Sequence, residues 1–288
     1  MKYRCIDRHR KHYPIRMMCN ALNVSRSGYY AWRNRPESQR SQQDRTLMPL
    51  IRQIHTDSKG VYGAPRIRAE LKDQGYHHGV HKIARLMRIA DLKGIPKRRF
   101  KVARQTLHNI RAAKNLLQQD FTAKAPNQRW AADITYIPTY RGMLYLAIVM
   151  DLYSRRIVGW SMEPWMTRQL VINALTMALG ARQPEGQLIH HSDRGAQYTS
   201  DEFRAALKHH GITCSMSAVG NCYDNAVVES FFGLLKRERV NRVRYRTHDD
   251  ARADIFEYIE CFYNRQRRHS YVGYVSPAEF EHQTVGLN

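Results

Sequence analysis

The spacing of apolar residues changes near residue 129 and divides the chain into two parts. Upstream of that point, apolar side chains recur every three or four positions, which is the period of a helix. The stretch 14–32 shows this spacing twice, with Asn23 at the intervening turn and Ser25 placed to cap the second helix. The pattern predicts a helix-turn-helix unit, and an ordinary helical hairpin explains it equally well.

A second pair of helices is expected between residues 63 and 88. Pro65 opens the first helix, because proline is tolerated in a first turn, and Gly75 ends it. The second helix, at 81–88, combines an apolar face with a face of basic side chains, as a helix that reads a DNA groove requires. A solvated charged face is the alternative, and it is disfavoured because the charges in 77–90 all have one sign.

The following stretch, 93–114, contains eight Lys or Arg residues and lacks a sustained core pattern. Pro96 breaks its beginning. We expect a linker that follows the DNA backbone, with a partly helical end at 110–117.

Downstream of Arg129 the apolar pattern changes to that of strands joined by short turns. Three such runs in succession predict an antiparallel meander. Alternating helices and strands follow, which together predict a ribonuclease-H-like α/β fold with a mixed five-stranded sheet flanked by helices. The expected elements are strands at 130–138, 143–151 and 156–162, a helix at 168–180, a strand at 187–191, a helix at 200–210, a strand at 212–216 and a helix at 223–241.

Charge is distributed unevenly along the 288 residues, whose formal net charge is +22. Residues 1–120 carry 27 Lys and Arg against 8 Asp and Glu, a net charge of +19. Residues 121–288 carry 20 against 17, a net charge of +3. The first part is therefore expected to bind a polyanion by displacing phosphate counterions. The second suits an enzyme core, although a ribosomal or membrane-surface protein can also be basic.

Several other classes of protein are disfavoured by sequence. The five cysteines are scattered and form no CxxC pair, so neither a disulfide framework nor a zinc ribbon is indicated. The first thirty residues lack the apolar segment of a signal peptide, and the most apolar stretch, 143–150, is too short to span a bilayer. A phosphate-binding Walker A loop is absent, so ATP is not expected. The expected location is the cytoplasm.

Three carboxylates stand in contexts that favour metal chemistry. Asp133 lies within a strand-like run, where an unpaired charge is costly. Asp193 follows a short strand, and 35 residues (194 through 228) separate it from Glu229 on a predicted helix. Each alone could bond to backbone, cap a turn or pair with a basic residue. Together, on so basic a chain, they predict two divalent cations roughly 3.5–4 Å apart for attack on a phosphodiester.

Neighbouring residues refine this candidate site. Lys236 lies seven positions after Glu229 and shares its helix face, so it is expected to contact a phosphate. His190 and His191 have the wrong spacing for zinc and are interpreted as polar loop residues. Trp130 and Tyr136 are interpreted as core residues beside the catalytic strand.

Four runs of the second part together resemble transposases of bacterial insertion sequences. They are WAADITYI, HSDRGAQYTS, GNCYDNAVVESFFGLLKRE and YNRQRRHSYVGYVSPAEF. The chain is most similar to OrfB, the downstream product of the two-reading-frame insertion-sequence-three family, whose catalytic core resembles retroviral integrases. The run YGAPRIRAEL is similar to the helix-turn-helix module of that family. Departures are small: Val272 replaces a more usual leucine, and 118–120 is less basic than the family connector.

This resemblance implies an activity and a set of partners. Asp133, Asp193 and Glu229 occupy the catalytic acidic positions and would hold two Mg²⁺, for which Mn²⁺ could substitute. The implied reaction is cleavage and strand transfer at the ends of the element, with water and then a DNA 3′-hydroxyl as nucleophile. Implied partners are double-stranded DNA of the terminal repeats and target, further copies of the chain, and the upstream-frame product or its fusion. The implied setting is the bacterial nucleoid.

The expected domains are a helix-turn-helix-like segment at 1–45, a second helix-turn-helix domain at 46–92, a basic linker at 93–124, an integrase-like core at 125–240 and a helical basic segment at 241–288. The candidate DNA contacts beside Lys236 are Arg66, Arg68, Lys82, Arg85, Arg88, Lys97, Arg98, Arg99, Arg265, Arg268 and His269. Two alternatives are a domesticated, non-catalytic DNA-binding protein and a ribonuclease-H-type nuclease. Intact acidic positions disfavour the first, and the helix-turn-helix units disfavour the second.

Overall fold

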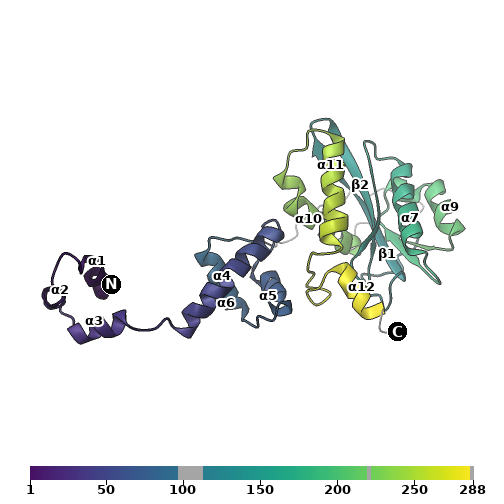
Figure 1. Cartoon of the computed structure of the whole chain (residues 1–288). Coiled ribbons are helices and arrows are strands. Elements are labelled where there is room, and N and C mark those ends of the chain that lie inside the picture. The colour runs from purple at the N-terminus through teal and green to yellow at the C-terminus, as the bar shows by residue number, and fades with distance from the viewer. Residues whose placement is uncertain (97–112, 219–221, 286–288) are drawn as a thin grey trace.

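The computed structural model describes residues 1–96, 113–218 and 222–285, and it shows helical units that precede an α/β core (Figure 1). The first unit contains α1 (Lys2–His9), α2 (Ile15–Ala21) and α3 (Arg26–Arg33). They enclose a small cluster of Ile6, Cys19 and Tyr29. The side chain of Ser25 accepts a hydrogen bond from the backbone of Gly28 at 3.0 Å, which confirms the predicted cap.

The second unit contains α4 (Gln39–Asp57), α5 (Ala64–Asp73) and α6 (Val80–Ile89), which pack against one another. Helices α5 and α6 lie where the sequence predicts them. Helix α4 was not predicted, and the expected domain division after residue 45 falls inside it. Its buried residues Leu47, Ile51 and Ile54 do have helical spacing. Pro49 lies within the helix, and because proline usually breaks a helix interior, it obscures this pattern in the sequence.

The basic connector lies mostly outside the described residues, including Lys97, Arg98 and Arg99. The expectation of a helical end at 110–117 is wrong for its described part, 113–117, which is irregular. Here the backbone N–H of Leu116 donates to Ser215 Oγ at 2.9 Å. This bond ties the described end of the connector to the edge strand β5.

The core contains a mixed sheet of five strands, as the sequence predicts, and their order in the sheet is β3-β2-β1-β4-β5. Antiparallel pairing joins the first three strands of the chain, and parallel pairing joins β1 to β4 and β4 to β5. Their bounds are β1 (Arg129–Thr139), β2 (Gly142–Asp151), β3 (Ile157–Glu163), β4 (Ile189–Ser192) and β5 (Thr213–Met216).

Side chains alternate between the two faces of this sheet, and different helices cover each face. Trp130 and Ala132 pack with α7 (Arg168–Arg182) and α9 (Asp201–His209). The short helix α8 (Ala196–Thr199) lies between these two helices in the chain. On the other face, Ala131 and Ile137 pack with α10 (Ala226–Glu238) and α11 (His248–Phe256). The chain ends in a π-helix (Glu257–Tyr263) and α12 (Pro277–Val285).

Helix α10 is shorter than the predicted helix at 223–241. A 3₁₀ turn, Cys222–Asn225, precedes it, and a second, Val240–Arg242, follows it. Periodicity alone does not separate these turns from an α-helix, because apolar residues recur at similar intervals in both.

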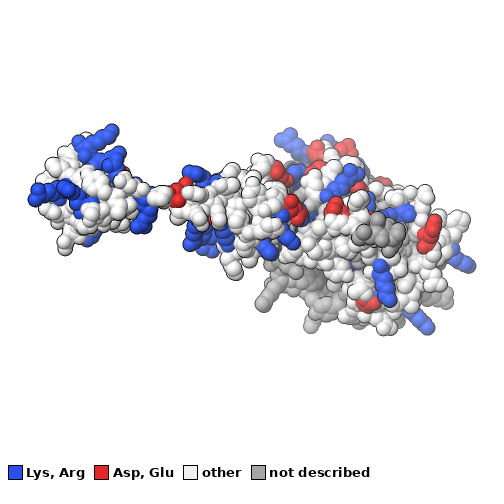
Figure 2. Space-filling view, turned by 60° about the horizontal axis from the view of Figure 1, so that its bottom comes forward, with Lys and Arg blue, Asp and Glu red and all other residues white. Residues whose placement is uncertain are grey.

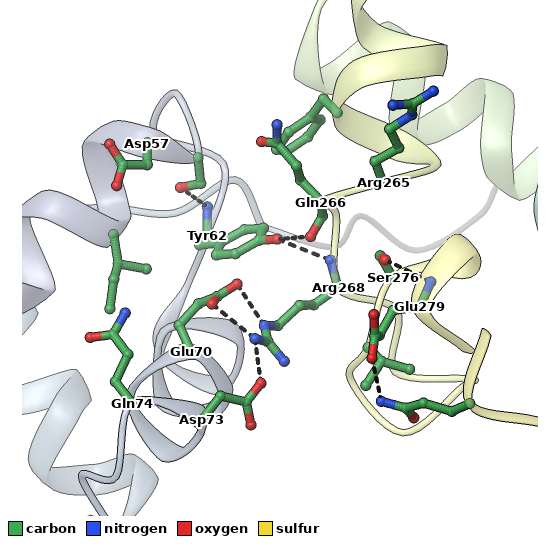
Figure 3. A pocket seen from close by; sticks show the side chains of 15 residues that line it. Asp57, Tyr62, Glu70, Asp73, Gln74, Arg265, Gln266, Arg268, Ser276 and Glu279 are labelled. Atoms are coloured by element: carbon green, nitrogen blue, oxygen red, sulfur yellow. Dashed lines mark hydrogen bonds and ion pairs between the residues drawn. The ribbon is translucent and has the colours of Figure 1, made fainter. Parts of the chain in front are cut away.

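The α4–α6 unit shares a hydrophobic core with the sheet. Buried residues of α4, α5 and α6 belong to the same cluster as those of α10 and α11. At their boundary the rings of Tyr62 and Phe262 lie 6.4 Å apart, and Tyr62 Oη donates to the carbonyl of Gln266 (Figure 3). Arg268 reaches across to Glu70 and Asp73 at 2.6 Å each. These contacts dock the α4–α6 unit on the C-terminal segment.

Candidate active site

Strand register places two of the three predicted carboxylates side by side. In the parallel pair β1 and β4, the last matched residues are Ala131 and His191. Asp133 lies two positions further along β1, and Asp193 directly follows the last residue of β4, so the same register continued by two residues brings the two aspartates level. Neighbouring strands lie about 4.8 Å apart, so both carboxylates lie close together at one end of this pair. Asp133 shares its side of the strand with Ala131, and therefore faces α10.

Local backbone bonds hold both aspartates. Asp133 Oδ1 accepts a hydrogen bond from the backbone of Ile134 at 2.8 Å. Asp193 Oδ1 accepts one from the backbone of Gly195 at 2.9 Å. A Cβ at position 195 would lie 3.0 Å from that same carboxylate oxygen, which explains the glycine there. Each aspartate keeps its second oxygen available to a ligand.

Glu229 enters the site from the first turn of α10, which packs against β1. A helix N-terminus carries partial positive charge and favours a carboxylate. The helix begins after Asn225, whose Nδ2 donates to the carbonyl of Ala132 at 3.3 Å and so fixes α10 to the strand that carries Asp133. Glu229 Oε2 is buried, and within the described chain it has no hydrogen-bond partner. A buried oxygen without a donor is suited to accept a cation.

The three carboxylates influence one another electrostatically. Burial raises the pKa of Asp133 well above its usual value, and the nearby charges of Asp193 and Glu229 raise it further. Burial also raises the pKa of Asp193. Burial and the charge of Asp193 raise the pKa of Glu229. All three groups therefore resist ionisation in the absence of a compensating positive charge.

These carboxylates do not form a closed ligand set. Among the residues described, no three His, Cys, Asp or Glu side chains are grouped closely enough to hold a metal ion. Bringing like charges together is costly unless a bound cation offsets their repulsion. The donor set consists of oxygen ligands alone, which fits Mg²⁺ or Mn²⁺.

Lys236 lies beside the carboxylates, as its spacing predicts. Burial lowers the pKa of Lys236, and the nearby charge of Asp133 opposes that change. The Lys236 Nζ also lies 4.2 Å from the centre of the Tyr136 ring. The expectation that Tyr136 is a core residue is wrong: it is 53% exposed and supports the lysine from the surface, whereas Trp130 is fully buried.

Two further residues near the site were not found from sequence. Tyr198 lies under the aspartates, whose charges, together with burial, raise its pKa well above the usual value. Its hydroxyl is buried and has no hydrogen-bond partner in the described structure. Asp224 accepts hydrogen bonds from the backbone of Ala218 at 2.7 Å and from Asn115 at 2.9 Å, and it thereby anchors the entry to α10. Neither residue has a pattern that distinguishes it from its neighbours in sequence.

The interpretation of His190 and His191 as polar loop residues is wrong. Both lie in β4 and are completely buried. His191 Nδ1 lies 2.9 Å from Ser215 Oγ on the neighbouring strand. Burial lowers the pKa of His190 to about 3, so its ring is neutral near pH 7.

The basic face of α6 is partly occupied by contacts with α4. Arg85 pairs with Asp44 at 2.6 Å, and Lys82 contacts Gln43 at 2.7 Å. Arg88 is exposed. Arg68 is also exposed, although its Nε donates to a backbone carbonyl of the following turn. Figure 2 shows Lys and Arg side chains spread over the first two helical units.

The candidate DNA contacts at the C-terminus separate into exposed and buried residues. Arg265 is exposed. Arg268 is engaged with Glu70 and Asp73, as Figure 3 shows, and Arg66 Nε donates to the Arg268 carbonyl at 2.9 Å. His269 is 8% exposed and packs edge-on against a buried tyrosine ring. This structure therefore places Arg66, Arg268 and His269 within protein contacts.

Family models match most of the chain. Two models described as integrase core domain match residues 123–222 and 229–285. A model described as HTH-like domain matches residues 42–100. None of the described helices has the length and apolarity needed to cross a membrane.

Relatives of known name match along nearly the whole length. The transposase InsF for insertion sequence IS3A of Escherichia coli (strain K12) is 45% identical over 287 residues, which cover 99% of this chain and 100% of the relative. An uncharacterized 31 kDa protein of insertion element IS600 from Shigella sonnei is 45% identical over 263 residues, or 91% of this chain and 97% of the relative.

Solved structures show weaker similarity. The catalytic core domain of HTLV-2 integrase in complex with magnesium is 18% identical, with a TM-score of 0.44, and the match covers 55% of this chain and 99% of that one. An intasome of simian T-cell lymphotropic virus in complex with a PP2A regulatory subunit is 16% identical, with a TM-score of 0.46 and coverage of 80% and 73%.

Proposed function

As a member of the IS3 family of transposases, this chain is a polynucleotidyl transferase with an integrase core domain, and we propose that it cleaves and joins DNA strands at the ends of an insertion sequence. The proposed catalytic and metal-binding residues are Asp133, Asp193 and Glu229. The observation that carries the proposal is electrostatic: the charges of Asp193, Glu229 and Lys236 all act on Asp133, and the pKa of each of the three carboxyl groups is raised.

Electrostatics supports a role for cations at these carboxylates. Both Asp193 and Glu229 raise the pKa of Asp133, so bound cations, which Asp133, Asp193 and Glu229 would hold, would favour the ionised form of Asp133. The unpartnered Oε2 of Glu229 supplies a further oxygen. Two bound Mg²⁺ would activate the attacking oxygen and stabilise the leaving one, and Mn²⁺ should replace them.

Residues of this chain would position the catalytic carboxylates and the DNA. Asp133 lies on β1 and Asp193 directly follows β4, and the backbone N–H groups of Ile134 and Gly195 orient their carboxylates. Lys236 would hold a DNA phosphate next to the one that reacts, with its ammonium group positioned above Tyr136. No covalent intermediate with the protein is required.

We also propose that DNA is held by the helical units. The HTH-like match at residues 42–100 includes α5 and α6, where Arg68 and Arg88 are exposed. The proposed partners are the terminal repeats and target DNA, further copies of the chain, and the upstream-frame product or its fusion. The domain divisions expected from sequence are retained as proposals, except that α4 belongs as a whole to the second unit.

The test is a nicking and joining assay on a labelled duplex that carries the DNA flanking this gene. The full chain would be assayed with Mg²⁺ or Mn²⁺, alone and with the upstream-frame product. Glu229→Gln should lower the rate of strand joining about 10³-fold or more, because it removes a metal-ligand charge while keeping the shape of the side chain. Glu185→Gln, at an exposed position, is the matched control and should retain activity.

The products separate the proposed activity from the alternatives. Metal-dependent joined strands support a transposase. Cleavage without joining would indicate a nuclease, and binding without any chemistry in the presence of the upstream-frame product would indicate a non-catalytic DNA-binding protein. Either of these last two results contradicts the proposal.

A further inference from the structure

A cavity lies beside α10, on a different side of this helix from Glu229 and Lys236. Its volume is about 370 Å³, and it lies between the α4–α6 unit, α10 and the C-terminal segment. Its lining includes Ser230 and Arg237 of α10, and it includes none of Asp133, Asp193, Glu229 and Lys236. The cavity is thus separate from the proposed catalytic site.

The charge of this lining is strongly unbalanced. Its ionised side chains are Arg66, Arg155, Arg237 and Arg267, against the single acid Glu238. Arg267 and Glu238 form a fully buried two-point ion pair, with N–O distances of 2.6 and 2.8 Å, and so offset each other. Three arginines remain without a carboxylate in the cavity.

Those three arginines have few partners. Arg66 donates to a backbone carbonyl and lies over the Tyr62 ring. Arg237 is half-buried, and the described residues offer it no ion pair or hydrogen bond. Arg155 is only 7% exposed and stacks on Tyr271, with its guanidinium carbon 3.9 Å from the ring centre. Burial lowers the pKa of Arg66 and of Arg155 despite the charges of Glu238 and Asp151, so an anion bound in this cavity would stabilise their ionised forms.

Arg155 provides the most specific observation. Its NH2 donates to the carbonyl of Phe121 at 3.3 Å, whereas its NH1 is buried and, within the described structure, has no acceptor. Its backbone has φ +66°, a left-handed conformation that is unusual for a residue other than glycine. Tyr263 Oη donates to the Arg155 carbonyl at 3.1 Å and helps to hold this conformation. The fold thus maintains an unfavourable backbone that directs a buried cation to the cavity.

The other titratable group of the lining agrees with this charge balance. Burial and the charges of Arg267, Arg66 and Arg155 lower the pKa of His269 well below its usual value. His269 is therefore neutral and adds no charge of its own. The local field nevertheless favours an anion.

We propose that this cavity binds a phosphate group, held by the arginines that line it, Arg155, Arg237 and Arg66. Guanidinium groups match phosphate oxygens with paired hydrogen bonds, and they stay charged even when buried. The volume is larger than one phosphate group needs, so it also has room for an attached sugar. The expected source is the backbone of a DNA strand, which rests on the proposed function, and free phosphate is the other source of the same chemistry.

The first arm of the test measures inorganic phosphate binding by the full chain, without metal and without DNA. Titration calorimetry at constant ionic strength would compare wild type with Arg155→Gln, Arg237→Gln and Arg141→Gln. The last is the matched control, because Arg141 is exposed in the β1–β2 turn and undergoes the same change of charge. We expect phosphate affinity to fall at least about 10-fold in Arg155→Gln and several-fold in Arg237→Gln, and to be unchanged in Arg141→Gln.

The second arm measures the affinity for duplex DNA at several salt concentrations. Loss of one phosphate contact should reduce the slope of log affinity against log salt by about 0.9. A reduced slope in Arg155→Gln and Arg237→Gln identifies DNA as the source, and weakened phosphate binding with an unchanged slope identifies free phosphate. If neither variant differs from Arg141→Gln in either arm, the site does not exist. Both arms measure binding alone, so their results can be interpreted even if the protein proves to have no catalytic activity. If Arg155→Gln does not fold, Arg237→Gln still tests the site.

Discussion

Asp133 combines two unfavourable features at the scale of a single residue. It is a carboxylate on a buried strand, and two other carboxylates raise its pKa. Both effects favour the protonated form of Asp133 in the folded protein. Without a bound cation, the ionised form of Asp133 therefore lowers the stability of the fold. Such a conflict between stability and chemistry is typical of functional sites.

Asp133→Asn should therefore stabilise the metal-free protein while abolishing strand joining. The folded-state pKa lies above the usual 3.8, so the folded chain binds more protons than the unfolded chain between those two values. Stability then falls as pH rises through that window, and the asparagine variant avoids this loss. In EDTA at pH 7, we expect the thermal midpoint to rise by about 2–4 °C, and by less near pH 4.

Asp91→Asn is the control for this prediction. Asp91 is exposed and has φ +53°, a conformation that asparagine also tolerates. Its midpoint should be nearly unchanged at both pH values. A variant at 133 that unfolds at a lower temperature than wild type at pH 7 would contradict the assignment of a destabilising charge.

The contact between α7 and β3 shows how tightly elements pack behind the site. Gly159 of β3 lies directly against α7. A Cβ at this position would overlap the Ala174 carbonyl and lie 2.7 Å from the Ala178 side chain. Helix α7 can therefore approach this strand only where a side chain is missing.

Gly159→Ala should destabilise the fold by about 1–3 kcal/mol, because the added methyl group forces α7 away from the sheet. Gly180→Ala is a matched change within α7, where an added Cβ meets no atom within 4 Å. It should stabilise the helix by about 0.5–1 kcal/mol. Urea unfolding measures both changes, and equal effects of the two substitutions would show that the close approach has no energetic consequence.

At the same scale, sequence spacing predicted the strands and most helices but not the ends of α10. The alternation of residues in β1 is strong enough to identify the strand, because its two faces pack against different layers of helices. The division of 222–242 into an α-helix between two 3₁₀ turns depends on long-range bonds such as that from Asn225 to Ala132. Local pattern holds no information on those bonds.

The docking of the α4–α6 unit is a property of the whole molecule. Arg268 of the C-terminal segment binds Glu70 and Asp73 of α5, and the backbone N–H of Arg268 donates to Tyr62 Oη at 2.9 Å (Figure 3). Residues about two hundred positions apart in sequence thus determine how the α4–α6 unit faces the α/β core.

Arg268→Ala should loosen this docking without unfolding either part. The loss is about 2 kcal/mol for the charged hydrogen bonds, reduced because Asp73 is 58% exposed. We expect a larger radius of gyration in solution scattering and a broader thermal transition. Arg265→Ala changes an exposed arginine three positions earlier in the same segment, so it is the control and should change neither. A wild-type scattering profile for Arg268→Ala would show that the apolar contacts suffice for docking.

The sequence by itself determined the fold class, the family and the three acidic candidates. Those features depend on periodicity and on short runs of residues, which are local properties of the chain. The level positions of Asp133 and Asp193 arise from strand pairing. Only the tertiary structure decided which basic residues remain exposed: Arg68, Arg88 and Arg265 do, whereas Arg85 and Arg268 pair with acids distant in sequence. The reason is physical, because an ion pair depends on distance in space, and sequence spacing does not encode that distance between separate elements.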